Sequence, residues 1–193
     1  CLSMQAILAA SEHAEGLAAE LAEACEEEDQ RAEIVATNGH RLLIGLLGAG
    51  PESKTTEDAL GALVNLCCLD GSEPPLIEAG VVAPTVALLR TAPTASNKVL
   101  LANGARLVAN LATTSAGIEA CQKAGAIVPL VSLLGAASEI AMQAAGALCS
   151  ISYDNEARKA EILEAGAIPP LVALLHGETA GEAAGALRNL ANA

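Results

Sequence analysis

Aromatic side chains are nearly missing from this chain of 193 residues, which has one Tyr, no Phe and no Trp. Hydrophobic residues still make up 52% of the sequence, so a core must be built from Leu, Ile, Val and Ala. The strand-favouring residues Val, Ile and Thr nowhere alternate with polar residues. The sequence therefore predicts closely packed helices, and a sheet is not expected.

Basic residues are also scarce. Ten Lys and Arg stand against 23 Asp and Glu, which gives a net charge of −13. This balance argues against nucleic acid as a partner, because phosphates attract Lys and Arg. The acidity is compatible with a basic protein partner, or with a surface that is acidic only for solubility.

Long apolar runs are absent as well. None reaches the roughly 18 residues that a membrane-spanning helix needs, and no signal peptide pattern is present, so we expect no direct membrane insertion. The chain begins with Cys1 and not with Met, which we interpret as a processed chain or a piece of a longer one.

The six cysteines form no CxxC pair and no zinc-binding pattern with His. The adjacent pair Cys67 and Cys68 lies in an apolar helical run, and we predict that these thiols are small buried hydrophobes. Free thiols indicate a reducing compartment, so the predicted location is the cytoplasm or the nucleus.

No catalytic constellation, cofactor site or metal site is predicted. His13, His40 and His176 lie in different parts of the chain, with no recurring acid or Cys beside them. We interpret His40 and His176 as exposed histidines of loops or helix ends. Neither a nucleophile elbow nor a phosphate-binding glycine loop is present, so the chain is not expected to be an enzyme.

A phrase of 12 residues recurs along the chain. It reads "EAGAIPPLVALL" at 164–175, "KAGAIVPLVSLL" at 123–134, "EAGVVAPTVALL" at 78–89 and, more weakly, "ATNGHRLLIGLL" at 36–47. Its anchors are Asn38, Gly80, Gly125 and Gly166. Asn is the best replacement for Gly in a left-handed conformation. Each anchor is therefore predicted to end one short helix, and the prolines after it to begin the next.

A second apolar phrase recurs between the anchors, as in "ALGALVNLCCL" at 59–69 and "AAGALRNLANA" at 183–193. Each unit is predicted to hold two short helices and a longer third helix, and neighbouring units must stack to bury their apolar faces. The predicted repeats are 28–70, 71–114, 115–154 and 155–193. A partial repeat at 1–27 would supply the last two helices of a preceding unit.

This pattern resembles the armadillo repeat family. The match in the best copy comprises Gly166, Ile168, Pro170, Leu171, Val172, Leu174 and Leu175, and the third-helix pattern matches at Ala183, Ala186, Leu187, Asn189, Leu190 and Ala191. The consensus sequence of the repeat is most similar to that of the armadillo arrays of plant-type U-box proteins and of the vacuole-anchored armadillo protein. The resemblance implies an all-α, right-handed superhelical solenoid with three helices per repeat.

The resemblance also implies a binding site. In the family, Asn side chains of the third helices line the concave face and hold the backbone of an extended peptide, since a carboxamide both donates and accepts hydrogen bonds. The corresponding positions here are Glu23, Asn65, Asn110, Ser150 and Asn189. The alternative is that these Asn residues only cap helices or pair within the helix interface.

One departure from the family affects the predicted partner. Nuclear-import adaptors carry Trp four residues before the Asn, where this chain has Gly61, Arg106, Gly146 and Gly185. Without aromatic slots, and with Arg106 repelling a basic peptide, binding of a classical nuclear localisation signal is not expected. Too few basic residues are present for a beta-catenin-like groove. The small residues indicate either a smooth, shallow groove or close helix packing.

The predicted function is a non-enzymatic scaffold or adaptor that binds a partner protein or extended peptide on its concave face, or serves as a structural subunit of a larger assembly. One alternative is the substrate-recruiting part of a ubiquitin ligase whose U-box lies outside this chain, and another is an adaptor tethered by an acylated N-terminal segment. The acidic run at 26–29 could steer a basic partner or supply charge to the next helix N-terminus.

Overall fold

The computed structural model describes residues 4–177 and 179–191, which form a curved stack of helices without any strand among them. The helices are α1 (Met4–Ala24), α2 (Glu28–Ala36), α3 (His40–Leu46) with the 3₁₀ turn η1 (Leu47–Ala49), α4 (Lys54–Leu66), α5 (Glu73–Glu78), α6 (Val82–Leu89), α7 (Lys98–Leu111), α8 (Ser115–Ala124), α9 (Ile127–Leu133), α10 (Ser138–Ser152), α11 (Glu156–Glu164), α12 (Ile168–Leu174) and α13 (Ala180–Ala191). After α1, they follow one another in four groups of three.

The start of the chain differs from the prediction. Two helices were expected within 1–27, but Met4–Ala24 is one continuous helix. Gly16 is its only glycine and the helix contains no proline, so nothing in its sequence breaks it. α1 therefore occupies the place of a third helix and packs directly against α4.

The four predicted corners are confirmed. Gly80, Gly125 and Gly166 have φ values of 82°, 66° and 79°, and Asn38 has 60°. At each corner the amide of the residue that follows the left-handed residue donates to a carbonyl five residues back, for example Ala126 to Cys121 at 3.0 Å. This is the hydrogen bond of a Schellman motif, which requires a left-handed residue. The second helix then begins within two residues, and in α12 the two prolines occupy its first turn.

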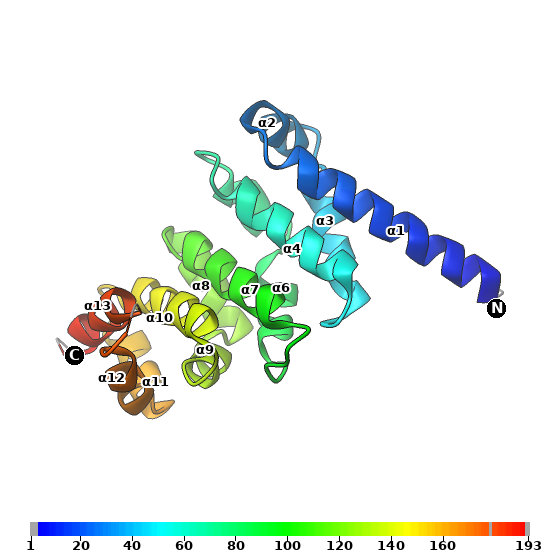
Figure 1. The fold of residues 1–193 in the computed structure, drawn as a ribbon. Coiled ribbons are helices and arrows are strands. Elements are labelled where there is room, and N and C mark those ends of the chain that lie inside the picture. Colours follow the sequence, from blue (N-terminus) through cyan, green and yellow to red (C-terminus); the bar gives the residue numbers. More distant parts are fainter. Residues whose placement is uncertain (1–3, 178, 192–193) are drawn as a thin grey trace.

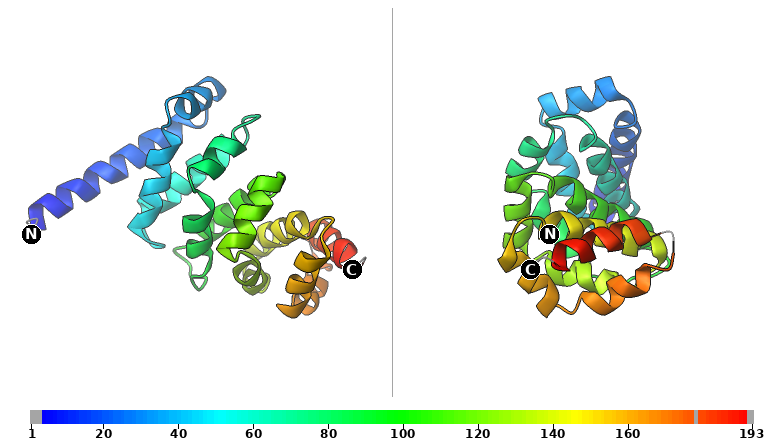
Figure 2. Two further views of the ribbon diagram at one scale, coloured as in Figure 1. Left: turned by 180° about the vertical axis from the view of Figure 1, so that it is seen from behind. Right: turned by 90° about the vertical axis from the view of Figure 1, so that its left-hand side faces the viewer.

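The longer helices α1, α4, α7, α10 and α13 lie side by side in chain order, each in contact with the next (Figure 1). The shorter helices cover them from behind, as the reverse view of Figure 2 shows. Buried Leu, Val, Ile and Ala residues form one continuous core that runs from Cys25 to Leu190. The small aliphatic side chains allow this close spacing, as expected from the composition.

Two arginines fasten the start of a repeat to the third helix before it. The guanidinium of Arg158 on α11 donates to the carbonyls of Ile151 and Tyr153 at 2.7 and 3.2 Å. Arg31 on α2 donates to Cys25 and Glu26 at 2.9 Å each. Carbonyls at a helix C-terminus lack helical partners. Arg158 therefore caps the end of α10 and Arg31 caps the end of α1, and each sets the direction of the helix that follows.

The prediction for the paired cysteines was wrong in part. Cys67 caps the C-terminus of α4 and is half-buried, whereas Cys68, one residue past the cap, is exposed. Cys25 and Cys121 are fully buried, and burial raises their pKa to about 11 and about 12. Cys25, Cys67, Cys68, Cys121 and Cys149 are all free thiols.

Within the described ranges, no helix has the length and apolarity to cross a membrane.

Candidate functional site

The five predicted ladder residues lie on five neighbouring helices. Glu23, Asn65, Asn110, Ser150 and Asn189 belong to α1, α4, α7, α10 and α13 in turn. Glu23 is exposed and the other four are half-buried. We call these residues the ladder row, and the surface of the five helices on which they lie the ladder face. The spacing along the chain thus places one such side chain on each third helix.

A second polar row lies on the same face and was missed by the sequence analysis. It comprises Asp58, Asn103, Gln143 and Glu182, each seven residues before a member of the ladder row. Seven residues are about two helical turns, so the two rows share a helix face. The signal was present in the sequence as a recurring polar residue at this spacing.

The glycines between the two rows make room for neighbouring side chains. A Cβ on Gly61 would lie 3.6 Å from the amide nitrogen of Asn103, and one on Gly146 would lie 3.2 Å from a carboxylate oxygen of Glu182. Side chains of the second polar row therefore lean over the glycine of the preceding third helix. At Gly185 a Cβ would instead lie 3.0 Å from the Cys149 sulfur, so there the glycine permits close helix packing.

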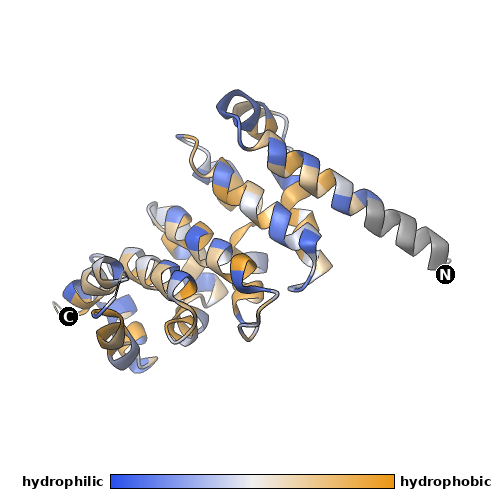
Figure 3. Ribbon diagram, in the orientation of Figure 1, coloured by the Kyte–Doolittle hydropathy of each residue, from blue (hydrophilic) through white to orange (hydrophobic). Residues whose placement is uncertain are grey.

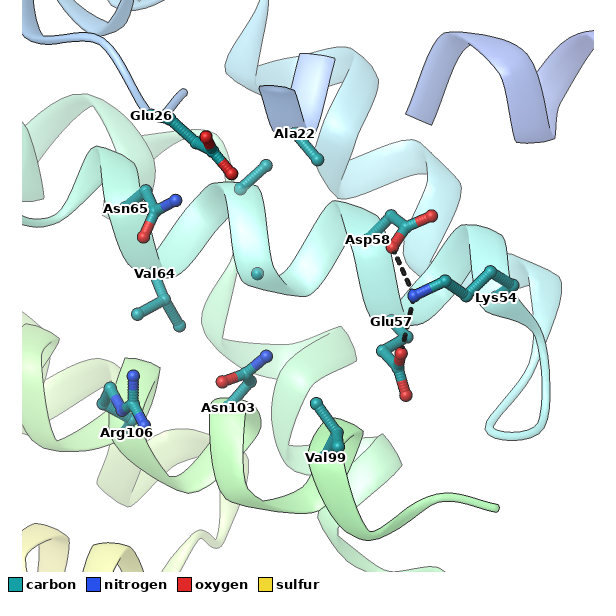
Figure 4. Close-up of a pocket in the computed structure, with 12 residues that line it drawn as sticks. Ala22, Glu26, Lys54, Glu57, Asp58, Val64, Asn65, Val99, Asn103 and Arg106 are labelled. Carbon is teal, nitrogen blue, oxygen red and sulfur yellow. Dashed lines mark hydrogen bonds and ion pairs between the residues drawn. The ribbon is translucent and has the colours of Figure 1, made fainter. Parts of the chain in front are cut away.

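A hollow of about 270 Å³ opens on the ladder face between α1, α4 and α7. Figure 4 shows Glu26 and Asn65 at one end, Glu57 and Asp58 at the other, and Asn103 projecting from α7 toward α4. Its remaining lining is Ala22, Lys54, Gly61, Ala62, Val64, Val99 and Arg106. The hollow therefore presents two carboxamides among three carboxylates.

Lys54 shows that the carboxylates of Glu57 and Asp58 bind a positive charge. Its amino group lies 2.8 Å from an oxygen of Glu57 and 2.8 Å from an oxygen of Asp58. The hydrogen bonds with Asp58 and Glu57 hold the pKa of Lys54 well above its ordinary value. Because the Lys54 side chain is 68% exposed, this contact is weak and easily exchanged for another cation.

The carboxamides of the ladder row have different surroundings. Asn189 donates to the carbonyl of Cys149 at 3.0 Å and to the hydroxyl of Ser152 at 3.2 Å, so it joins α13 to α10. The side chains of Asn65 and Asn110, and of Asn103 in the second row, make no hydrogen bond within 4–177 and 179–191. Asn189 thus pairs within the helix interface, which is the alternative that the sequence left open. The carboxamides of Asn65, Asn103 and Asn110 are available to a ligand.

Arg106 lies in the middle of the ladder face at one of the positions where import adaptors carry Trp. It is half-buried, and its guanidinium lies 3.7 Å from a carboxylate oxygen of Glu139 on α10. On the N-terminal side of the face, a further hollow of about 470 Å³ is lined by Glu20, Glu23, Glu26 and Glu27 with Ala24 and Gln30. Negative charge is therefore concentrated at α1 and α4.

The acidic run at 26–29 also serves the helix that follows it. Glu27 is the N-cap of α2, and Glu28 and Asp29 lie in its first turn, where negative charge stabilises the helix dipole. This agrees with the helix-terminus interpretation of the run. The start of α2 is one of the most hydrophilic parts of the array (Figure 3).

The prediction for His40 was wrong. His40 begins α3, but its side chain is only 1% exposed, and neither ring nitrogen has a hydrogen-bond partner in the described part of the chain. Val82 and Ile127 occupy the same repeat position, so His40 has taken a core position between repeats. Burial lowers the pKa of His40, and the charge of Arg41 lowers it further. His13 and His176 are exposed.

We expect His40 to make the array sensitive to acid. Because the folded state resists protonation, the unfolded chain binds a proton first as the pH falls through the unfolded His pKa of about 6.5. The free energy of unfolding should then decrease by up to about 1.4 kcal/mol per pH unit. Urea unfolding at pH 7.5 and pH 5.0 measures this loss. His40→Val, with the side chain found at position 82, should abolish that part of the loss; an equal loss in the variant would contradict the assignment.

No group of three or more His, Cys, Asp or Glu side chains in the described part of the chain is arranged to hold a metal ion.

Comparison with known proteins identifies the repeat type. The family model for the armadillo/beta-catenin-like repeat matches residues 155–192, and no curated protein matches the chain. Among solved structures, an engineered protein is 32% identical with a TM-score of 0.80, covering 94% of this chain and 74% of its own. Computationally designed armadillo repeat proteins for modular peptide recognition are 28% identical with a TM-score of 0.78, over 97% of this chain and 76% of theirs.

A further designed armadillo repeat protein was solved in complex with the peptide (KR)4. It is 27% identical with a TM-score of 0.73, and the match covers 97% of this chain and 76% of that one. These similarities confirm the expected fold, an all-α, right-handed superhelical solenoid of three-helix repeats. They show the fold, and the similarity to U-box proteins and to the vacuole-anchored protein stays a prediction of the sequence.

Proposed function

We propose that this chain, whose fold is similar to that of designed armadillo repeat proteins, is a non-enzymatic scaffold whose ladder face binds an extended peptide segment of a partner protein. The observation that carries this proposal is the set of carboxamides at Asn65, Asn103 and Asn110, which have no hydrogen-bond partner among the described residues. A half-buried amide without a partner loses part of its hydration and regains hydrogen bonds when a ligand arrives.

The chemistry of the face suits a peptide backbone. An extended strand offers an N–H and a C=O at regular intervals, and each carboxamide can pair with both, whatever the side chains of the ligand are. Asn65 and Asn110 lie on the adjacent helices α4 and α7, so two rungs act together. The similar designed protein in complex with (KR)4 supports this use of the face.

The charges of the face suit one basic side chain of the ligand more than a basic run. Glu26, Glu57 and Asp58 surround the hollow, and Lys54 already demonstrates an ammonium group bound between two of them. Arg106 lines the same hollow from α7, so a second cation on that side would be repelled. The proposed ligand therefore carries Lys or Arg near α4 and an uncharged or acidic residue near Arg106.

Removal of the two amides tests the proposal. Peptides of about ten residues selected from a random library for binding to the wild-type chain serve as probes, and affinities are measured by fluorescence anisotropy. Each Asn→Ala change at 65 and 110 removes hydrogen bonds worth about 0.5–1.5 kcal/mol, so the double variant should bind about 5- to 140-fold more weakly.

The matched control is Gln122→Ala, which removes an exposed carboxamide from α8 and should leave the affinity unchanged. Equal affinities of the wild-type chain and the Asn65→Ala/Asn110→Ala variant would reject peptide binding through the ladder row. A role in a ubiquitin ligase stays a prediction of the sequence resemblance, and a U-box encoded upstream in the full-length transcript would support it.

A further inference from the structure

The connection between α6 and α7 is longer than its counterparts in the repeats on either side. It spans residues 90–97, whereas 50–53 joins η1 to α4 and 134–137 joins α9 to α10. The longer loop projects from the lower edge of the stack in Figure 1. Both adjoining repeats are complete, so this loop belongs to the interior of the array.

Hydrogen bonds hold the long loop in one conformation. Asn97, which is only 1% exposed, accepts a hydrogen bond from the Thr94 amide at 2.8 Å and donates one to the Ala92 carbonyl at 3.0 Å. The hydroxyls of Thr94 and Ser96 contact the carboxylate of Glu52 in the preceding repeat. Because the loop is already ordered, a ligand that packs against it pays little entropy to fix it.

The loop and α9 enclose a hollow of about 350 Å³, which we call the loop pocket. Its lining includes the buried side chains of Leu89, Pro129 and Leu133 and the exposed ones of Ala92, Pro93 and Val128. The pocket therefore has an apolar base and opens to solvent on one side. A small molecule is usually enclosed almost completely by its site, so this open pocket is better suited to one side chain of a longer segment.

The hydroxyl groups of the loop pocket are already engaged. Thr91 donates to the carbonyl of Leu88 at 2.7 Å, and Ser132 donates to the carbonyl of Val128 at 3.0 Å. A polar side chain that entered would lose its hydration and gain few hydrogen bonds in return. An aliphatic side chain gains free energy by the same burial.

Arg90 gives the loop pocket a positive charge. One terminal nitrogen of its guanidinium donates to the carbonyls of Ala124 and Gly125 at 3.1 and 3.3 Å, which fixes the group against the corner before α9. Its Nε and its other terminal nitrogen make no hydrogen bond to any described residue. None of the described lining residues is acidic. These free donors can therefore bind a carboxylate of a ligand.

This charge is confined to one repeat. Arg90 lies ten residues after the anchor Gly80, and the same position after the neighbouring anchors holds Gly48 and Gly135. The long loop is found in that same repeat. The loop pocket is thus a feature of this chain and not of the repeat type.

We propose that the loop pocket is a second docking site, which binds a segment of another protein that carries an aliphatic side chain next to an acidic one. The aliphatic side chain enters between the loop and α9, and the carboxylate pairs with Arg90. The ladder face favours a basic side chain at its hollow, so the two sites select unlike segments. They share no lining residue, and docking here does not depend on Asn65 or Asn110.

The test is a titration of the isotopically labelled whole chain with a defined peptide, followed by NMR. The probe has two Leu between two Glu, with Gly and Ser on both sides, so either chain direction offers the same pair of side chains. Its ends are acetylated and amidated, so that every carboxylate belongs to a side chain. One control peptide replaces both Glu by Gln, and the other replaces both Leu by Ala.

The probe should shift the amide signals of the loop and of α9. The Gln peptide should bind about tenfold more weakly or worse, because a hydrogen bond to a charged group is lost. The Ala peptide should bind more weakly for want of the apolar contact. The proposal is overturned if millimolar probe shifts neither the loop nor α9, or if either control peptide binds as well as the probe.

Protein variants test the two contacts separately. Arg90→Gln should bind the Glu and Gln peptides alike, a loss of coupling that a purely structural role of Arg90 would not cause. Val128→Ser should weaken binding of the probe about threefold or more. The matched control is Val172→Ser on α12, which changes another exposed valine and should leave the affinity unchanged.

Well-dispersed amide spectra of the variants show that they are folded. A variant at Arg90 that still prefers the Glu peptide, or a Val128→Ser variant that binds like the wild type, contradicts the proposal. Because the probe lacks a basic side chain and the two sites share no lining residue, failure here is distinct from failure of binding at the ladder face.

Discussion

Gly117→Ala is expected to lower the free energy of unfolding by about 3 kcal/mol or more. Gly117 is the third residue of α8 and is buried against the end of α7. A Cβ at this position would lie 1.8 Å from the carbonyl oxygen of Leu111 and 2.6 Å from its carbonyl carbon. Both atoms belong to the backbone, so relief requires α8 to move away from the last turn of α7.

The same movement would break the cap of α8, in which the Gly117 amide donates to the Thr114 hydroxyl at 3.1 Å. Urea unfolding of the variant measures the combined loss. Gly45→Ala is the matched control, because Gly45 lies within α3, has nothing within 4 Å of its Cβ position and is not left-handed. That change should stabilise the chain by about 0.5–1 kcal/mol. A Gly117→Ala variant within 1 kcal/mol of the wild type would show that α8 adjusts freely.

Leu107→Ala is expected to cost about 2–5 kcal/mol. Leu107 is fully buried on α7, the central third helix, which contacts both α4 and α10. Truncation leaves a cavity where two repeat interfaces meet, and an array with a single aromatic side chain has few large groups to fill it. In a repeat protein, the energy of each interface contributes to the stability of its neighbours.

Hydrogen exchange should therefore show lost protection on both sides of α7, in α4 and in α10. Leu42→Ala removes the same atoms from a side chain that is 56% exposed and should change the stability by less than about 0.5 kcal/mol. If Leu107→Ala weakened protection in α7 alone, the repeats would be energetically independent, contrary to the single core of the structure.

Local chemistry made the corners predictable. A left-handed residue is required after each short helix, and only Gly, or Asn in its place, adopts that conformation at low cost. Because the requirement concerns one residue and its immediate neighbours, the sequence marks it wherever it occurs. The prolines of α12 were predictable for the same reason, since a first helical turn needs no amide donor from them.

The candidate site was predictable only in part. The ladder row could be located from its spacing to the corners, because one member lies on each third helix. That Asn189 pairs with Cys149 and Ser152, while Asn65 stays unpaired, depends on atoms of a neighbouring repeat. A sequence pattern does not contain the distances between atoms of neighbouring repeats.

By itself, therefore, the sequence determined the repeat, its three helices, the corners and the acidic, aromatic-poor character of the array. All of these depend on backbone preference and on composition. Only the tertiary structure decided that His40 is buried, that Cys68 is exposed and that Asn189 pairs with the neighbouring repeat. Burial and pairing are properties of two surfaces in contact, and residues far apart in the chain supply the second surface.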